Sequence, residues 1–303
     1  MSFVLAGTLP PFTFNLWQDV QTMLAYDFMR QALLAGTILS IITGLVGYFV
    51  VLRHQAFAGE SLSDVAFTGA LGGAAFGLNP FLSLLVTTIG VALVMGGFGE
   101  RLRGRDVAIG TVLAWVLGLG VLFLSLFTAN ASGTGTGFSG VTILFGNILG
   151  TSPEQVRTIA WISGAALLVL LLIARPLLFA SLDPDVAAAR RVPVRLLGLG
   201  FMVLLAVTVS EATLAVGALL VFALLLLPAA IAHQMVSRPF AALALAALLA
   251  VAFLWVGITI GFYSGYPSSV CISLLAFVSY VVVVGGSGQM RMAKRLNRGN
   301  LLK

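Results

Sequence analysis

Nine apolar runs divide this chain, and each is long enough, or nearly so, to cross a lipid bilayer. A helix that spans the hydrocarbon core needs about 20 residues. Backbone surrounded by lipid must satisfy its hydrogen bonds internally, so each run is expected to be a helix. The expected spans are Phe28–Leu52, Ser61–Leu78, Phe81–Phe98, Val107–Phe127, Arg157–Ala174, Val194–Ser210, Leu214–Val236, Phe240–Phe262 and Ser268–Gly285.

The chain has too few charged residues to cover a water-soluble protein of its size. Of its 303 residues, 60% are apolar and 9% are charged, and the mean hydropathy is +1.10. Soluble domains carry roughly 25% charged residues. Most of the surface must therefore face lipid, and the expected fold is an all-α integral membrane bundle of about nine spans. Eight spans remain the alternative, if two neighbouring short runs form one broken element.

The basic residues lie mainly on one side of the expected bundle. Fourteen of the sixteen lysines and arginines fall on the alternate loops that share a side with the C-terminus, and Arg30 and Arg157 are the exceptions. Cytoplasmic loops carry such an excess, which predicts an outer N-terminus and a cytoplasmic C-terminus. A nucleic-acid binder needs a dense basic face instead, so no nucleic-acid partner is expected.

Three segments of different character follow from this pattern. Residues 1–27 are expected to lie on the outer interface, because their later part is mildly amphipathic. Residues 28–286 form the expected transmembrane domain, and residues 287–303 form a basic cytoplasmic tail.

The longest inner loop predicts a short helix at about 183–191. Asp183 suits the N-cap position, Pro184 the first helical position and Asp185 the first turn. Pro193 then ends the turn, because proline cannot continue a helical hydrogen-bond pattern. Such a helix is either a plain connector or a docking element for a cytoplasmic partner.

Two acidic residues stand apart from the other eight. Glu60 and Asp64 fall where a loop becomes the second expected span, whereas the others lie in terminal or loop segments or, for Glu211, at an outer helix end. Residues four apart share a helix face, and like charges there repel unless a cation or proton sits between them. The pair is therefore a candidate site for a divalent metal. The competing interpretation is helix capping by Ser61 or Ser63, with the acids favoured near a helix N-terminus.

Other chemistry is poorly represented in the sequence. The chain lacks the GxxxxGK[ST] phosphate loop, so it cannot be a P-loop ATPase, and it lacks the HExxH and GxSxG motifs of membrane proteases. His54 and His233 are interpreted as interfacial or packed residues, and the single Cys271 excludes a disulfide framework. No intrinsic cofactor is expected.

Six stretches, in order, resemble the metal-ion permeases of ATP-binding-cassette importers, the ABC-3 family that serves manganese, zinc and ferrous iron. They are Phe28–Gly36, Val50–Leu71, Asp106–Ala114, Leu144–Ser152, Leu182–Val194 and Ala215–Ala232. The resemblance implies a fold similar to that of vitamin B12 and siderophore importer permeases, in a bacterial plasma (inner) membrane. It also implies a second permease chain in a dimer, expected to be a homodimer, two cytoplasmic ATP-binding cassette subunits, and an extracytoplasmic metal-binding protein.

The resemblance also assigns residues. The family typically has Asp and His, four apart, as its proposed metal-contacting pair; Glu60 takes the Asp position and Asp64 the His position. An all-oxygen pair suits harder ions such as Mn²⁺, whereas imidazole suits Zn²⁺. Arg191 stands where the family usually has glycine. The residues that match the family's ATPase-coupling helix are Asp183, Pro184, Asp185, Val186 and Ala187.

The expected function is therefore the passage of a divalent transition metal (Mn, Zn or Fe) into the cytoplasm by alternating access. In this interpretation the chain is a permease and not an enzyme, because separate subunits hydrolyse ATP. The alternative is a secondary metal transporter, driven by an ion gradient, that uses the same acids without an ATPase partner. Copurification with a nucleotide-hydrolysing subunit distinguishes the two.

Overall fold

A computed structural model describes residues 22–97, 105–130, 146 and 148–300, and all regular elements in these ranges are helices. The elements are α2 (Asp27–Leu52), α3 (Ala56–Ala75), α4 (Pro80–Gly97), α5 (Arg105–Asn130), η2 (Ile148–Gly150), α7 (Pro153–Leu182), α8 (Pro184–Ala189), α9 (Val194–Val216), α10 (Ala218–Met235), α11 (Pro239–Ser264) and α12 (Ser268–Asn300).

Nine of the described helices are long, and each coincides with one of the nine expected spans. Within the described ranges, eight of them are long and apolar enough to cross a membrane, and α3 is not among the eight. The all-α membrane fold is therefore confirmed. Helix α3 differs because most of its residues are buried inside the protein, where polar side chains can find protein partners instead of lipid.

The outside of the bundle is apolar. Trp161, Leu172 and Val86, on α7 and α4, are 80%, 73% and 70% exposed, and many other large apolar side chains accompany them. A water-soluble monomer rarely exposes contiguous apolar patches of this extent. Lipid is the solvent that such a surface requires.

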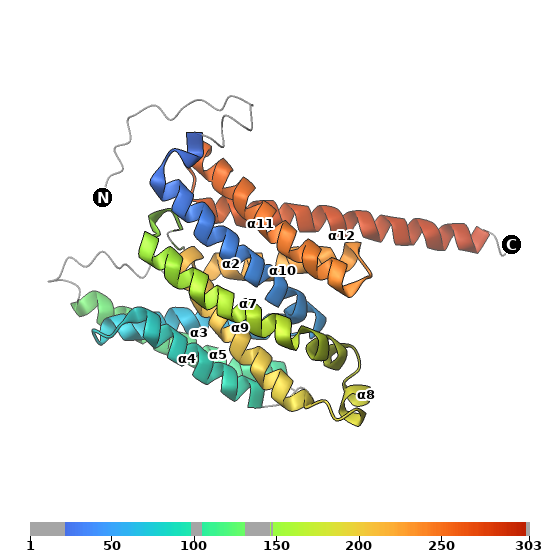
Figure 1. Ribbon diagram of the computed structural model, residues 1–303, viewed down its shortest axis with the longest axis horizontal. Coiled ribbons are helices and arrows are strands. Elements are labelled where there is room, and N and C mark those ends of the chain that lie inside the picture. Colours follow the sequence, from blue (N-terminus) through green and yellow to red (C-terminus); the bar gives the residue numbers. More distant parts are fainter. Residues whose placement is uncertain (1–21, 98–104, 131–145, 147, 301–303) are drawn as a thin grey trace.

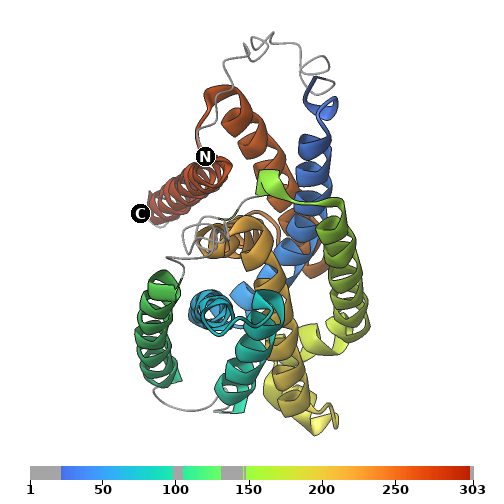
Figure 2. The ribbon, with the colours of Figure 1, turned by 90° about the vertical axis from the view of Figure 1, so that its left-hand side faces the viewer.

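The helices form two groups that α9 and α10 connect. Helices α3, α4 and α5 pack together, while α2, α10, α11 and α12 form the other group (Figure 1). Helix α9 packs against α3 and α4, α10 packs against α2 and α3, and α7 covers α2 and α9. Figure 2 shows α3 nearly end-on, between α4 and α5. This placement makes α3 an interior helix.

Helix α2 crosses its neighbours with backbone close to backbone. A Cβ atom added at Gly47 would collide with the carbonyl oxygen of Leu225 on α10, and one at Gly44 would lie 2.9 Å from the carbonyl oxygen of Ala246 on α11. Small residues on one helix face allow such approach in membrane bundles. Beside this crossing, the fully buried rings of Phe49 and Phe201 meet edge to face at 6.2 Å.

Several helices run past their expected ends, and α7 and α12 do so the furthest. Helix α7 continues through Arg175 and Pro176 to Leu182, and α12 continues to Asn300, into the predicted tail at 287–303. The expected ends were set by charge, but helical hydrogen bonding does not stop where a helix leaves the apolar layer. The N-terminal segment predicted for residues 1–27 lies outside the described residues, except for 22–27.

Candidate functional site

The turn between α2 and α3 fixes where the candidate metal pair lies. His54 adopts a left-handed backbone conformation with φ of 54°. Its N–H donates to the carbonyl of Val51, and the N–H of Gln55 donates to that of Val50. These two bonds form a Schellman motif, which ends a helix with one left-handed residue. His54 is therefore a turn residue that ends α2.

Helix α3 begins at Ala56, so neither candidate acid lies in its first turn. Glu60 and Asp64 are its fifth and ninth residues. The Gln55 side chain makes no capping hydrogen bond, and the Ser61 hydroxyl donates to the carbonyl of Phe57 within the helix at 2.8 Å. The capping interpretation of Glu60, Asp64 and the serines is therefore wrong, because all of them lie inside the helix.

Both carboxylates lie on the open stripe of an otherwise buried helix. Between Phe57 and Leu71, the residues that are not buried are Phe57, Glu60, Asp64 and Phe67. Their spacing of three and four residues places them on one face, as the sequence predicted. Glu60 is exposed and Asp64 is half-buried. In the described part of the chain, neither carboxylate forms an ion pair with a basic side chain.

Hydrogen bonds from residues near Asp64 tie α3 to two neighbouring helices. The Ser63 hydroxyl donates to the carbonyl of Ala218 at 2.8 Å, and the Thr68 hydroxyl donates to the carbonyl of Val116 on α5 at 3.3 Å. Ala218 opens α10 directly after Gly217, which links α9 to α10 with φ of 94° and ψ of 148°. Such backbone angles belong almost exclusively to glycine. The acid pair thus lies near the one-residue glycine joint between α9 and α10.

One copy of the chain supplies only part of a metal shell at this stripe. Among the described residues, no group of three or more His, Cys, Asp or Glu side chains could hold a metal. His233 is occupied elsewhere: its ring stacks on Tyr48 at 4.4 Å, and its Nε2 lies 3.2 Å from the Tyr48 carbonyl oxygen. Any ion on the stripe would need further ligands from water, backbone or a second chain.

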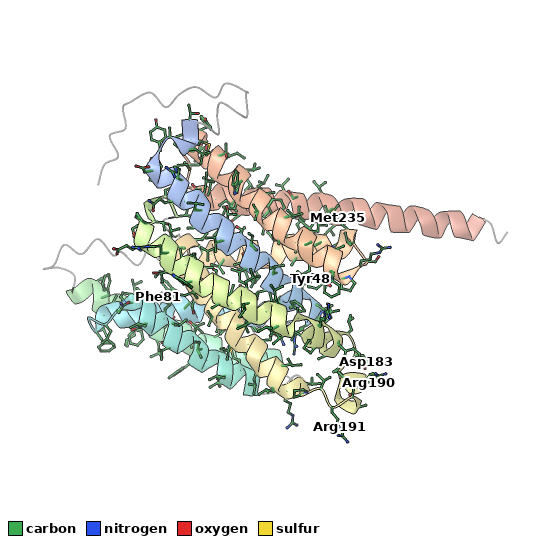
Figure 3. All side chains as sticks on the ribbon, viewed as in Figure 1. Tyr48, Phe81, Asp183, Arg190, Arg191 and Met235 are labelled. Carbon is green, nitrogen blue, oxygen red and sulfur yellow. The ribbon has the colours of Figure 1, made fainter. Side chains whose placement is uncertain are left out.

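The short inner helix lies where the sequence predicted it. The Asp183 carboxylate accepts a hydrogen bond from the Val186 N–H at 3.0 Å, and Pro184 is the first residue of α8. Ala187 is buried, whereas Asp183, Pro184, Asp185 and Val186 are exposed. In Figure 3, Asp183, Arg190 and Arg191 lie at the α8 end of the protein, beyond the long helices. Most of this helix is therefore exposed on the surface of the protein.

A left-handed residue also ends α8. Arg191 has φ of 61°; its N–H donates to the carbonyl of Ala188 at 3.0 Å, and that of Val192 donates to Ala187 at 3.1 Å. This is a second Schellman motif, with arginine at the position that glycine usually fills. The left-handed conformation costs a residue with a Cβ roughly 1–2 kcal/mol. The geometry explains why glycine suits this position.

Arg191→Gly is expected to stabilise the end of α8 by about 1 kcal/mol, because it removes the left-handed strain. That gain would slow hydrogen exchange at the Val192 amide by about fivefold. Arg190→Gly is the matched control: it removes the same charge from a residue with φ of −85° and should bring no gain. Equal exchange rates in Arg191→Gly and the original chain would contradict the prediction.

The sequence analysis missed one buried acid, Glu211. It was placed at an outer helix end because the expected span stopped at Ser210, but α9 continues to Val216 and Glu211 is only 3% exposed. Its carboxylate accepts a hydrogen bond from the Ser163 hydroxyl of α7 at 2.9 Å. The signal was present in the sequence, because apolar residues continue on both sides of this acid.

Comparison with known proteins agrees with this fold. The model of the family described as "ABC 3 transport family" matches residues 25–286. The manganese transport system membrane protein MntC of Halalkalibacterium halodurans is 31% identical, over 95% of this chain and 97% of that protein. The chelated iron transport system membrane protein YfeD of Yersinia pestis is 28% identical over 89% of each. The solved structure of PsaBC from Streptococcus pneumoniae in complex with Fab superposes with a TM-score of 0.76 at 24% identity, over 88% of this chain and 94% of that chain.

Proposed function

Because this chain belongs to the ABC 3 transport family, we propose that it is the membrane-spanning permease subunit of an ATP-binding-cassette importer for a divalent transition metal. The relatives named above serve manganese and chelated iron, so family membership leaves the choice among Mn, Zn and Fe open. The observation that carries the proposal is that Glu60 and Asp64, which form no ion pair among the described residues, share the one open stripe of α3. Two negative charges in a largely apolar bundle create a strong demand for a dication.

Glu60 and Asp64 are the proposed transient ligands of the passing ion. Each chain offers two carboxylates, so two permease chains, with their α3 stripes facing one path, would offer four. Oxygen ligands favour hard ions, and Mn²⁺ is the hardest of the three candidate metals. A transport site must also release its ion, and flexible carboxylates on an open stripe suit weak, brief binding.

Helix α8 would couple ATP hydrolysis to movement of the permease. Its exposed Asp183, Pro184, Asp185 and Val186 are the proposed contacts to a cytoplasmic ATP-binding cassette subunit, with Ala187 anchoring the helix from its buried side. Because α8 lies between α7 and α9, a movement of the ATPase would tilt both helices and exchange outer for inner access to the path. An extracytoplasmic binding protein would deliver the metal to the other side.

The charge pattern gives the proposed orientation in the bacterial inner membrane. The α8 segment, with Arg190 and Arg191, lies at the end of the bundle that carries the basic loops. An excess of basic residues is typical of the cytoplasmic side, so we propose that this end and the C-terminus are cytoplasmic. The N-terminus is then outside, together with the helix ends opposite α8.

Uptake in proteoliposomes tests this function. The chain, reconstituted with its ATPase and its binding protein, is expected to accumulate Mn²⁺ in preference to Zn²⁺ and Fe²⁺, and only when ATP is hydrolysed. The matched control uses the same proteoliposomes with a non-hydrolysable ATP analogue. Full uptake by the permease alone, driven by an imposed ion gradient, would instead establish a secondary transporter.

A further inference from the structure

A cavity of about 620 Å³ opens between α4, α7 and α9, and no residue of α3 lines it. It lies far from α8: Phe81, one of its lining residues, is at the opposite end of the bundle in Figure 3. Glu211 from α9 and Glu154 from the first turn of α7 both line the cavity, and no Lys, Arg or His is among the described residues that line it. The cavity therefore collects negative charge without a basic counterpart.

Glu211 is the less hydrated of the two acids. Its Oε2 accepts the hydrogen bond from Ser163, but its Oε1 is buried and has no hydrogen-bond partner within the described part of the chain. A carboxylate in such surroundings, with one oxygen unsatisfied, is costly unless a positive charge accompanies it. The cavity beside it is large enough to hold that companion.

Two of the three hydroxyl groups that line the cavity also favour a cation over an anion. The Thr151 hydroxyl donates its hydrogen to the Ile148 carbonyl at 2.7 Å, and the Thr158 hydroxyl donates to the Glu154 carbonyl at 3.0 Å. A hydroxyl has one hydrogen, so both groups present only oxygen lone pairs to the cavity. Carboxylate and hydroxyl oxygens are ligands of hard cations.

We propose that this cavity binds a hard divalent cation, with Glu211 as the buried charged ligand and Glu154 at the mouth. The site is separate from the Glu60–Asp64 stripe and does not depend on the transport role proposed for that pair. A proton on Glu211 is the competing way to neutralise the same carboxylate, and an experiment separates the two.

The test counts Mn²⁺ bound to the complex of permease and ATPase by equilibrium dialysis. The measurement uses the E60Q/D64N variant, so that Mn²⁺ bound by the Glu60–Asp64 stripe does not contribute to the count. In this variant we expect about one Mn²⁺ per permease chain, with affinity lowered at least about tenfold by Glu211→Gln. Glutamine keeps the size of the side chain and can still accept from Ser163, so only the charge is lost. Ca²⁺, another hard ion, should compete for the site.

Two further variants keep the result interpretable. Glu211→Asp keeps the charge and should retain Mn²⁺ binding within a few-fold, while Glu154→Gln, at the exposed mouth, should weaken binding less than Glu211→Gln does. Mn²⁺ should raise the melting temperature of the original complex but not of the Glu211→Gln complex. Equal Mn²⁺ binding by the original complex and Glu211→Gln, or no binding by either, would overturn the proposal. A proton would then be what neutralises the Glu211 carboxylate.

Discussion

Replacing Asp64 by asparagine is expected to reduce ATP-driven metal uptake by on the order of 100-fold at limiting metal. The change keeps the size of the side chain and removes one negative charge from the open stripe of α3, where Asp64 is half-buried. Loss of a group that supports a metal ligand already costs about 10- to 100-fold in affinity, and loss of a ligand itself costs at least as much. Glu60→Gln should have a smaller effect, because water reaches the exposed Glu60 and can replace its oxygens.

The controls for this experiment come from the same chain. Asp27→Asn removes an exposed acid at the start of α2, outside the stripe, and should leave uptake unchanged. Asp64→His would create an oxygen–nitrogen pair and should move preference from Mn²⁺ towards Zn²⁺. Normal uptake by both Asp64→Asn and Glu60→Gln would show that the acids have no part in transport.

Gly47→Ala is expected to prevent correct packing of the bundle and to lower stability by about 3 kcal/mol or more. The added methyl group would collide with the Leu225 carbonyl oxygen, where α2 and α10 cross. The added methyl group is attached directly to the α2 backbone, and the oxygen belongs to the α10 backbone. Neither can move away by a side-chain rotation. Overpacking in a well-packed interior costs about 1–3 kcal/mol even where side chains can adjust.

Gly164→Ala is the matched control for Gly47→Ala, because nothing lies within 4 Å of the added Cβ. Alanine is the better helix former by about 1 kcal/mol, so this variant should be neutral or slightly more stable. Fluorescence-detected size exclusion after heating gives the melting temperature of each variant in detergent. Gly47→Ala eluting as a single peak and melting with the original chain would refute the close crossing.

The sequence predicted the order of the long helices, and left the number of spans at eight or nine, because each apolar run in lipid must be a helix. It located their ends less well. The expected spans stopped at Ser210 and Ala174, where the next residue is Glu211 or Arg175, but α9 and α7 continue past both. Composition reports which residues prefer the apolar layer, whereas helix ends depend on caps, such as the Ser152–Gln155 capping box that begins α7.

The candidate site was predictable where it depends on spacing alone. The four-residue separation of Glu60 and Asp64 places both on one face of α3 in any register of the bundle. The partial burial of Asp64 depends on the packing of α3 against helices that are distant in sequence, as in the bond from Ser63 to Ala218, 155 residues away. The surroundings of Glu211 come from α7 in the same way, 48 residues from it.

The single-residue link at Gly217 has a mechanical consequence. Helix α9 has 23 residues and so measures about 34 Å from its N-terminus, which follows α8, to its C-terminus. Past that end, one residue leads to Ala218, whose carbonyl is bonded to Ser63, the neighbour of Asp64. No longer loop separates α9 from α10. A displacement of α9 at its α8 end would thus be passed to α3 through one helix, the Gly217 link and the Ser63–Ala218 hydrogen bond, all within one polypeptide.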